Sequence, residues 1–257
     1  MKKVLAIAVL VTAAASPVAA QMHENGPTEV PLRMEQGRLL VPVQAPDGTE
    51  LEFMLSTGTP PTVFSESTAA RLGDQTGLTI GGLPLNMEDI AIVPDEQLTM
   101  DGLVIAGIVG AMTLNEYDIL VDVPGERLVL KPFGRSVEWD GVELSDPIRL
   151  RVYHGVILGL DIEFNGREYQ AMLDLGMSTM VINEPVKTAM HLEAEGVSTL
   201  GLGGTTLSDL PVRVRDLEIF NNWDPDGAGF VIVGAPVAQN CAISISWVHR
   251  EMRTCVR

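Results

Sequence analysis

One aspartate stands directly after an apolar run, in the segment Met172-Leu173-Asp174-Leu175-Gly176. A carboxylate in such a position can act as a general acid or base. The segment Leu55-Ser56-Thr57-Gly58 ends a similar run in the first half of the chain, but the hydroxyl of Ser56 cannot act as a base near neutral pH. A serine nucleophile is not indicated either, because Ser56 lies in no Gly-x-Ser-x-Gly motif and no spacing assigns it a base among His154, His191 and His249.

These two segments belong to an internal repeat. Identical residues recur 118 positions apart in the pairs Met54/Met172, Leu55/Leu173, Gly58/Gly176, Val63/Val181 and Glu66/Glu184. Two later landmarks keep the same order, Leu78-Thr79-Ile80-Gly81-Gly82 against Leu200-Gly201-Leu202-Gly203-Gly204, and Gly107-Ile108-Val109-Gly110-Ala111 against Val231-Ile232-Val233-Gly234-Ala235. Their separation drifts only from 118 to 124. The sequence therefore predicts two lobes built on one plan.

Each lobe is expected to consist mostly of short strands separated by turns. The predicted strands are Leu39–Val43, Leu51–Leu55, Ile90–Val93, Ile119–Val123 and Arg127–Leu130, followed by Val156–Phe164 and Tyr169–Leu173. One short helix per lobe is predicted, Glu66–Leu72 after the cap residue Ser65 and Glu184–Leu192 after Asn183.

The chain ends and the region between the lobes have their own composition. Residues 1–20 are predicted to be a signal peptide, because Lys2 and Lys3 precede a short apolar run that ends in small residues. Cleavage would make Gln21 the first mature residue. We expect an irregular leader over 21–34, a first lobe over 35–133, a polar linker over 134–147 and a second lobe over 148–257.

The two strand-end segments resemble the active-site loops of aspartic proteases of the retropepsin-like and pepsin-like kind. In that family each lobe has a strand, an Asp-Thr/Ser-Gly loop and, later, two apolar residues followed by glycine. Here the second landmark recurs as Ile108-Val109-Gly110 and Ile232-Val233-Gly234. The resemblance covers nearly the whole mature chain. It implies a mainly β fold of two homologous β-barrel-like lobes with short helices, and a peptide-accommodating cleft between them.

The chemistry that this resemblance implies needs two carboxylates. Paired aspartates share one proton, so that one activates water while the other donates to the scissile carbonyl. Here Asp174 is the candidate catalytic residue, and Ser56 stands where the first aspartate is lost. Leu175 is a second departure, because the family has a hydroxyl residue there that bonds across the interface, a role that Thr57 keeps in the first lobe. The remaining candidate cleft-loop residues are Gly58, Gly176, Ser178, Gly110 and Gly234.

Three interpretations of this pair follow. In the first, the protein is inactive or impaired as a peptidase and binds a peptide or protein segment in the cleft. In the second, it is an active aspartic endopeptidase that uses Asp174 and an unidentified second acid. In the third, Asp174-Leu175-Gly176 is a turn in an unrelated β protein. The hairpins Leu78–Leu85 and Leu200–Leu207 are candidate flaps or lobe braces.

The charge and hydrophobicity of the chain limit its possible binding partners and its cellular compartment. The chain carries 34 Asp and Glu against 17 Lys and Arg, a net charge of −17, which argues against nucleic acid as a partner. After the first twenty residues no run is long and apolar enough to span a bilayer, so the mature form is expected to be soluble. The predicted signal peptide makes it secreted or periplasmic, and a monomer is expected because the duplicated lobe already occupies the interface where a second copy would pair.

The two cysteines complete this description. In an oxidising compartment an even count favours a bridge, and Cys241 and Cys255 flank an alternating run with a turn at Val248-His249-Arg250. We therefore expect a structural disulfide across a hairpin. The histidines form no metal-ligand grouping, so no metal or cofactor is expected.

Overall fold

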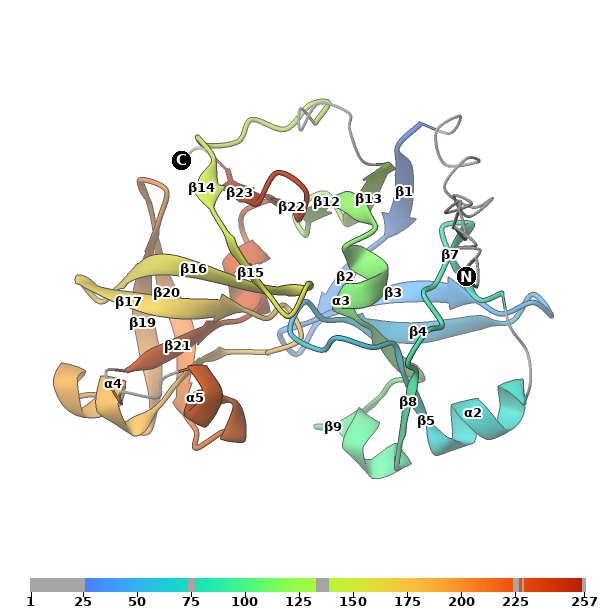
Figure 1. Cartoon of the computed structure of the whole chain (residues 1–257), viewed down its shortest axis with the longest axis horizontal. Coiled ribbons are helices and arrows are strands. Elements are labelled where there is room, and N and C mark those ends of the chain that lie inside the picture. The colour runs from blue at the N-terminus through green and yellow to red at the C-terminus, as the bar shows by residue number, and fades with distance from the viewer. Residues whose placement is uncertain (1–25, 74–76, 133–138, 224–226, 228, 256–257) are drawn as a thin grey trace, which may run out of the picture.

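The chain folds into two β lobes joined by a shared six-stranded sheet (Figure 1). The computed structural model describes residues 26–73, 77–132, 139–223, 227 and 229–255. The predicted mainly β fold with two barrel-like lobes is confirmed. The predicted signal peptide and the mature start at Gln21 lie outside the described residues.

The N-terminal lobe is a curled sheet that does not close on itself. Its path runs β7-β6-β3-β4-β11-β5-β8, and β2 pairs with β3 beside that path. The strands are β2 Arg33–Glu35, β3 Arg38–Gln44, β4 Glu50–Leu55, β5 Val63–Ser65, β6 Thr79–Ile80, β7 Leu83–Pro84, β8 Ala91–Val93 and β11 Gly107–Val109. A separate hairpin joins β9, Thr99–Met100, to β10, Leu103–Val104.

The C-terminal lobe repeats this plan but closes into a ring. The sheet runs β15-β16-β17-β21-β18-β20-β19, and β19 pairs with β16 as well as with β20. Its strands are β15 Arg151–Tyr153, β16 Ile157–Phe164, β17 Arg167–Leu173, β18 Met180–Ile182, β19 Glu195–Leu202, β20 Thr205–Val214 and β21 Phe230–Val233. The β19–β20 hairpin is longer than the hairpin expected around Gly203-Gly204.

The internal repeat reappears in the strand pairing. In the first lobe Ile108 pairs with Met54 on a parallel strand and with Val63 on an antiparallel one. In the second lobe Ile232 pairs in the same two ways with Met172 and Val181. The identical pairs Met54/Met172 and Val63/Val181 therefore meet the equivalent strand in each sheet.

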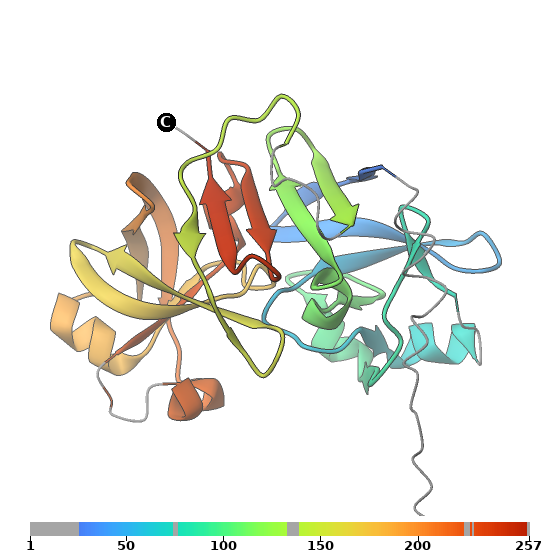
Figure 2. The ribbon, with the colours of Figure 1, turned by 45° about the horizontal axis from the view of Figure 1, so that its top comes forward.

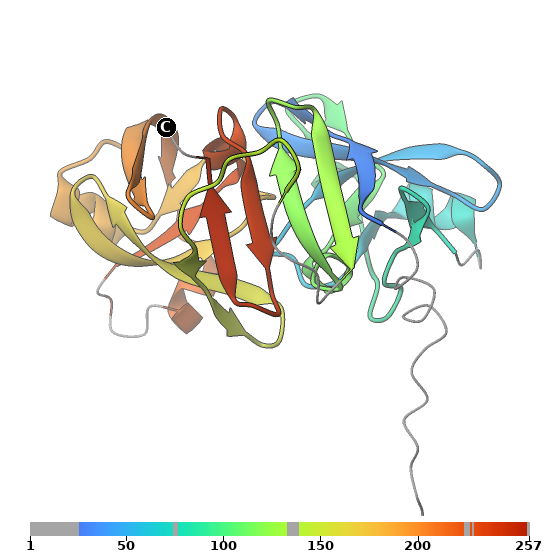
Figure 3. The ribbon, with the colours of Figure 1, turned by 90° about the horizontal axis from the view of Figure 1, so that it is seen from above.

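The six-stranded sheet takes three strands from each half of the chain, in the order β1-β13-β12-β22-β23-β14. These are β1 Thr28–Pro31, β13 Arg127–Pro132, β12 Tyr117–Asp122, β22 Ile243–Ser246, β23 Glu251–Thr254 and β14 Ile148–Arg149. The halves meet where β12 pairs with β22, and Figures 2 and 3 show the green β12–β13 hairpin beside the red β22–β23 hairpin. We call this β12–β22 junction the seam.

Residues 21–34 were expected to form an irregular leader, but the described part of this segment contains strands. Residues 28–31 form β1, which pairs with β13 along its whole length, and Arg33 already begins β2. The prediction was wrong there because Val30 and Leu32 are isolated apolar residues that give no strand pattern, yet both are buried. The described part of the predicted linker, residues 139–147, has no strand, although Leu144 forms a single bridge to Cys255.

Both predicted helices are present. They are α2, Glu66–Leu72, where the Ser65 hydroxyl accepts a hydrogen bond from Thr68 N, and α4, Glu184–Met190, where Asn183 Oδ1 accepts one from Val186 N. The second ends two residues earlier than predicted, since His191 adopts left-handed backbone angles.

The expectation of a single helix per lobe was wrong. The structure adds α3 Ala111–Leu114, α5 Glu218–Trp223 and the 3-10 turns η1 Asp95–Leu98 and η2 Ala235–Ala238. Most of these are four residues long, too short for a helical hydrophobic repeat to be visible in the sequence.

Candidate functional site

The two strand-end loops start at the same point of their respective lobes. Ser56 follows β4, and its backbone N–H donates to Val109 O of β11 at 3.1 Å. Asp174 follows β17, and its N–H donates to Val233 O of β21 at 2.9 Å. Both preceding strands end in buried apolar residues, so the core of each lobe fixes where its loop begins.

The structure brings the two predicted residues together. Ser56 Oγ donates a hydrogen bond to Asp174 Oδ1 at 2.9 Å, across 118 residues of sequence. Ser56 is fully buried and Asp174 is 5% exposed. We call Ser56 and Asp174 the Ser–Asp pair.

One oxygen of Asp174 receives most of the hydrogen bonds. Besides Ser56 Oγ, Oδ1 accepts from Gly176 N at 2.8 Å and from Gly58 N at 3.0 Å. Within the described residues, Oδ2 has no hydrogen-bond partner. Burial raises the pKa of Asp174 above its ordinary value, and the hydrogen bonds from Gly176, Ser56 and Gly58 oppose the rise. No second carboxylate of the described chain contributes to this shift.

Thr59 is a member of the site that sequence reasoning missed. Its backbone N–H donates to Ser56 Oγ at 3.0 Å, and Ser56 Oγ lies 3.0 Å from Thr59 Oγ1. The Ser56 hydroxyl is therefore held by its own loop while it faces Asp174. Serine hydroxyls can bond to nearby backbone groups in turns, but the residue type of Thr59 does not by itself signal this contact.

Thr57 of the first loop forms hydrogen bonds to the second loop, and no equivalent side chain of the second loop returns them. Its Oγ1 donates to Leu173 O at 2.8 Å and accepts from Leu175 N at 3.1 Å, so one buried side chain makes two contacts with the other lobe. Leu175 occupies the equivalent position in the second loop and is fully buried, but its side chain has no polar atom to return the contact. The predicted cross-lobe role of Thr57 and its loss at Leu175 both agree with these contacts.

The glycines at the site allow the loops to approach. A Cβ on Gly58 would lie 2.3 Å from Asp174 Cγ, and a Cβ on Gly176 would lie 2.7 Å from Ser56 Oγ. Behind the loops, a Cβ on Gly110 would lie 2.0 Å from Pro61 O and one on Gly234 2.2 Å from Thr179 O. All four positions exclude a side chain for the same reason, and they do so in matching pairs.

Ser178 has a different place from the one its motif position implied. Its backbone oxygen is the nearest atom to a Cβ built on Gly37, at 2.7 Å. Gly37 lies in the turn between β2 and β3, so this turn of the first lobe packs on the second loop. Within the described chain, Ser178 makes no hydrogen bond to the Ser–Asp pair.

The two hairpins predicted to be flaps or lobe braces lie against the six-stranded sheet. A Cβ on Gly81, in the β6–β7 turn, would lie 2.6 Å from the Thr28 side chain of β1. A Cβ on Gly203, in the β19–β20 turn, would lie 2.7 Å from the Ile148 side chain of β14. Both turns thus pack on the outermost strands of the six-stranded sheet.

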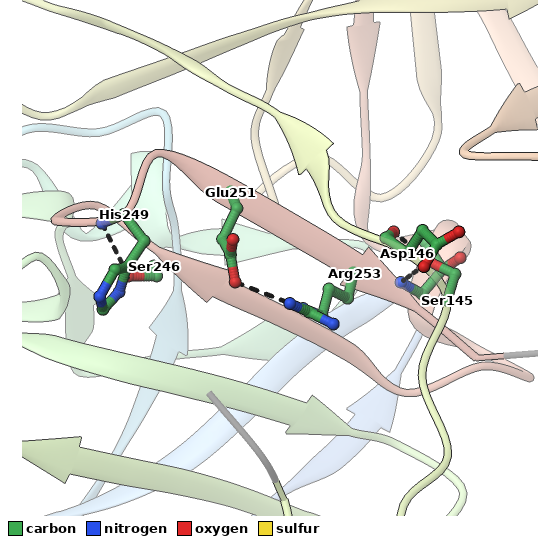
Figure 4. A network of polar contacts seen from close by, with 7 residues as sticks. Ser145, Asp146, Ser246, His249, Glu251 and Arg253 are labelled. Carbon is green, nitrogen blue, oxygen red and sulfur yellow. Dashed lines mark hydrogen bonds and ion pairs between the residues drawn. The ribbon is translucent and has the colours of Figure 1, made fainter. Parts of the chain in front are cut away.

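The predicted disulfide is present between Cys241 and Cys255, with the Cα atoms 5.3 Å apart. It closes the β22–β23 hairpin. Figure 4 shows the neighbouring polar contacts of this hairpin, including Ser246 Oγ at 2.9 Å from His249 Nδ1 and Arg253 Nε at 3.3 Å from Glu251 Oε1. The Ser246 and Arg253 contacts link near neighbours in sequence, whereas Ser145 Oγ accepts a hydrogen bond from Thr254 N at 3.2 Å across 109 residues.

Neither the cavities nor the possible metal ligands point to a site that includes the Ser–Asp pair. Two cavities of about 380 and 480 Å³ lie in the first lobe, and neither is lined by Ser56 or Asp174. Among the described residues no group of three or more His, Cys, Asp or Glu could hold a metal ion, and no helix is long and apolar enough to cross a membrane.

No family model matches this chain, and no curated protein matches it either.

Proposed function

We propose that this protein is an aspartic-protease-like binding protein, whose two lobes hold an extended peptide at the Ser–Asp pair and whose peptidase activity is absent or impaired. The observation that carries the proposal is the 2.9 Å contact between Ser56 Oγ and Asp174 Oδ1, made by two equivalent loops that glycines allow to meet. Because the strand pairing repeats, both loops start at the same position of their respective lobes.

The loss of activity follows from the chemistry of the pair. Hydrolysis by two carboxylates needs one ionised and one protonated group, and Ser56 supplies only a neutral hydroxyl. Removing one member of a catalytic unit removes most of its rate. Among the described residues, the three donors to the carboxylate of Asp174 all bind Oδ1, which leaves Oδ2 as the oxygen that could accept a hydrogen bond from a ligand.

An active endopeptidase is the second candidate, and it needs another acid. Within the described chain, burial raises the pKa of Asp174, three hydrogen bonds oppose that rise, and no second acid is among the causes. Absent or impaired activity is therefore favoured over an intact mechanism.

A secreted or periplasmic location is part of the same proposal. The disulfide between Cys241 and Cys255 supports an oxidising compartment, where such bonds persist. An excess of acidic residues on the protein further favours peptide over nucleic acid as its ligand.

The test is cleavage of a diverse peptide library from acidic to neutral pH by four forms of the mature protein. These are the natural protein, Asp174→Asn, Ser56→Asp, and Asp161→Asn as a control that removes an exposed acid elsewhere. We expect little or no cleavage by the natural protein and a clear gain with Ser56→Asp. Efficient cleavage by the natural protein that Asp174→Asn abolishes would overturn the proposal in favour of the active alternative.

Binding is tested with the same variants. Peptides retained by the natural protein should be lost with Asp174→Asn and kept with Asp161→Asn. If Ser56→Asp is folded yet cleaves nothing, and no peptide depends on Asp174, the protease-like interpretation fails.

A further inference from the structure

The strand β8 of the first lobe and the strand β20 of the second occupy equivalent places. Each runs parallel to the short strand that follows its strand-end loop, with Val63 opposite Ala91 in one lobe and Val181 opposite Arg213 in the other. Each therefore forms the next strand outward in its sheet. The two lobes differ in what lies beyond it.

In the second lobe the outer edge of β20 is covered. The strand β19 pairs with it in antiparallel fashion, with Glu195 opposite Arg213 and Gly196 opposite Val212. In the first lobe β8 lies at the end of the sheet, and within the described residues it pairs only with β5.

The open edge of β8 carries both backbone and apolar groups. The Ala91 N–H donates to Thr62 O on the inner side, so the N–H and C=O of Ile92 point outward, because alternate residues of a strand face opposite edges. Ile90 is 43% exposed and Ile92 55% exposed, in a protein where few large apolar side chains are exposed. An extended segment placed here would bond to the backbone and cover both side chains.

Charge decides what kind of segment fits. The exposed acids Glu88 and Asp89 precede the strand, and Asp95 and Glu96 follow it. Asp95 Oδ1 accepts a hydrogen bond from Ser67 N, which supports the ionised carboxylate. A second copy of this chain, with a net charge of −17, would be repelled, whereas lysine or arginine on either side of an apolar segment would be attracted.

We propose that the outer edge of β8 is a docking site for an extended peptide segment that adds an antiparallel strand to the first lobe, with β-branched or apolar side chains against Ile90 and Ile92 and basic residues at both ends. The binding mode is the one that β19 shows on β20 in the same molecule. The site is separate from the Ser–Asp pair and does not depend on the function proposed for it.

The experiment uses an array of short peptides with alternating valine, isoleucine and threonine, flanked by lysine and arginine. Two matched arrays carry glutamate flanks or N-methylated backbone amides, which cannot pair with a strand. We expect binding to the basic array, at least about ten-fold weaker binding to both control arrays, and weakening at high salt. Hydrogen exchange should show protection of the Ile92 amide when peptide is bound.

A variant pair locates the site. Ile90→Lys with Ile92→Lys should abolish binding, while Val197→Lys, a change of an exposed apolar residue on the covered β19–β20 hairpin, should not. Failure of every basic peptide to bind, equal binding of N-methylated peptides, or insensitivity to the β8 substitution would each overturn the proposal. If no basic peptide binds, the acids and Pro94 around β8 serve only to keep other strands away from a short edge.

Discussion

The two lobes share a strand plan but differ in closure, and the difference has a cause that can be read from the chain. Equivalent glycines lie 118 residues apart before the lobe helices, at Gly58 and Gly176, whereas the landmark leucines lie 122 apart after them, at Leu78 and Leu200. The second lobe thus has four additional residues between helix and hairpin. They lengthen β19 enough to pair with β20, and the ring closes.

The loops differ in a complementary way. The first lobe keeps the hydroxyl that bonds across to the other lobe, at Thr57, but has no carboxylate. The second has the carboxylate, Asp174, but no hydroxyl at Leu175. Each chemical role is therefore present once, and the pair of loops still forms one continuous contact. The two loops therefore contribute different side chains to one contact.

The largest effect is expected from comparing the two hairpins that meet at the seam. The β22–β23 hairpin is closed by the disulfide, and the β12–β13 hairpin by an ion pair between Asp122 Oδ2 and Arg127 Nε at 2.9 Å. Replacing Cys241 and Cys255 by serine should lower the free energy of unfolding by about 3 kcal/mol, since the unfolded chain gains the entropy of an open loop. Asp122→Asn should lower it by about 1 kcal/mol. Urea unfolding measures both, and equal losses would contradict the comparison.

A glycine substitution tests the close approach of the loops. Gly58→Ala should destabilise the protein by about 2 kcal/mol, because the added methyl group overlaps the Asp174 carboxyl group. Gly196→Ala is the matched control, as its Cβ would meet no atom within 4 Å. Urea unfolding should separate the two variants clearly. A Gly58→Ala protein as stable as the control would mean that the loops do not meet as described.

The one-sided tie between the loops is tested at Thr57. Thr57→Val keeps the shape of the side chain but removes the contacts with Leu173 O and Leu175 N, and should cost about 1.5 kcal/mol. The exposed Thr99→Val, which loses a hydrogen bond to Asp95 O in its own turn, should cost less than about 0.5 kcal/mol. Thermal unfolding compares them. Adding Leu175→Thr to the Thr57→Val variant tests whether a hydroxyl in the second loop can replace that of Thr57. A gain in stability would mean that the hydrogen bond between the loops can be supplied from either lobe.

The smallest expected effect depends on pH and concerns Asp118 of β12, next to the seam. The side chain is fully buried, and neither carboxylate oxygen has a hydrogen-bond partner among the described residues. Burial raises the pKa of Asp118. The Ser246 hydroxyl, His249 and Lys131 oppose that rise, and Glu251 adds to it. The folded state therefore favours the protonated form, so stability is greatest below the unfolded pKa and falls as pH rises through the folded one.

It follows that Asp118→Asn should stabilise the protein at neutral pH, by about 1 kcal/mol, and have little effect under acidic conditions. Urea unfolding at a series of pH values measures this. A loss of stability at neutral pH would show that the ionised carboxylate has a partner.

Much of this architecture was accessible from the sequence, because the repeat and the apolar strands are strong local signals. The meeting of Ser56 with Asp174 was predictable only through the two loops together, since neither residue marks a site alone. The strand β1 was not predictable, because its pairing with β13 depends on the finished sheet rather than on its own pattern. Thr59 was missed for a related reason, as its role depends on the orientation of a neighbouring hydroxyl.

The seam has a consequence for the newly made chain. The strands β1, β13 and β12 are complete once the first half has been synthesised, but β12 has no partner on its second edge until Ile243–Ser246 has been added. An unpaired strand edge invites other chains, and an inward-pointing charge is one means by which proteins discourage such pairing. Asp118 is such a charge on the waiting strand. The carboxylate that we expect to weaken the finished protein at neutral pH would protect the incomplete one, so Asp118→Asn should aggregate more during refolding, as light scattering would record.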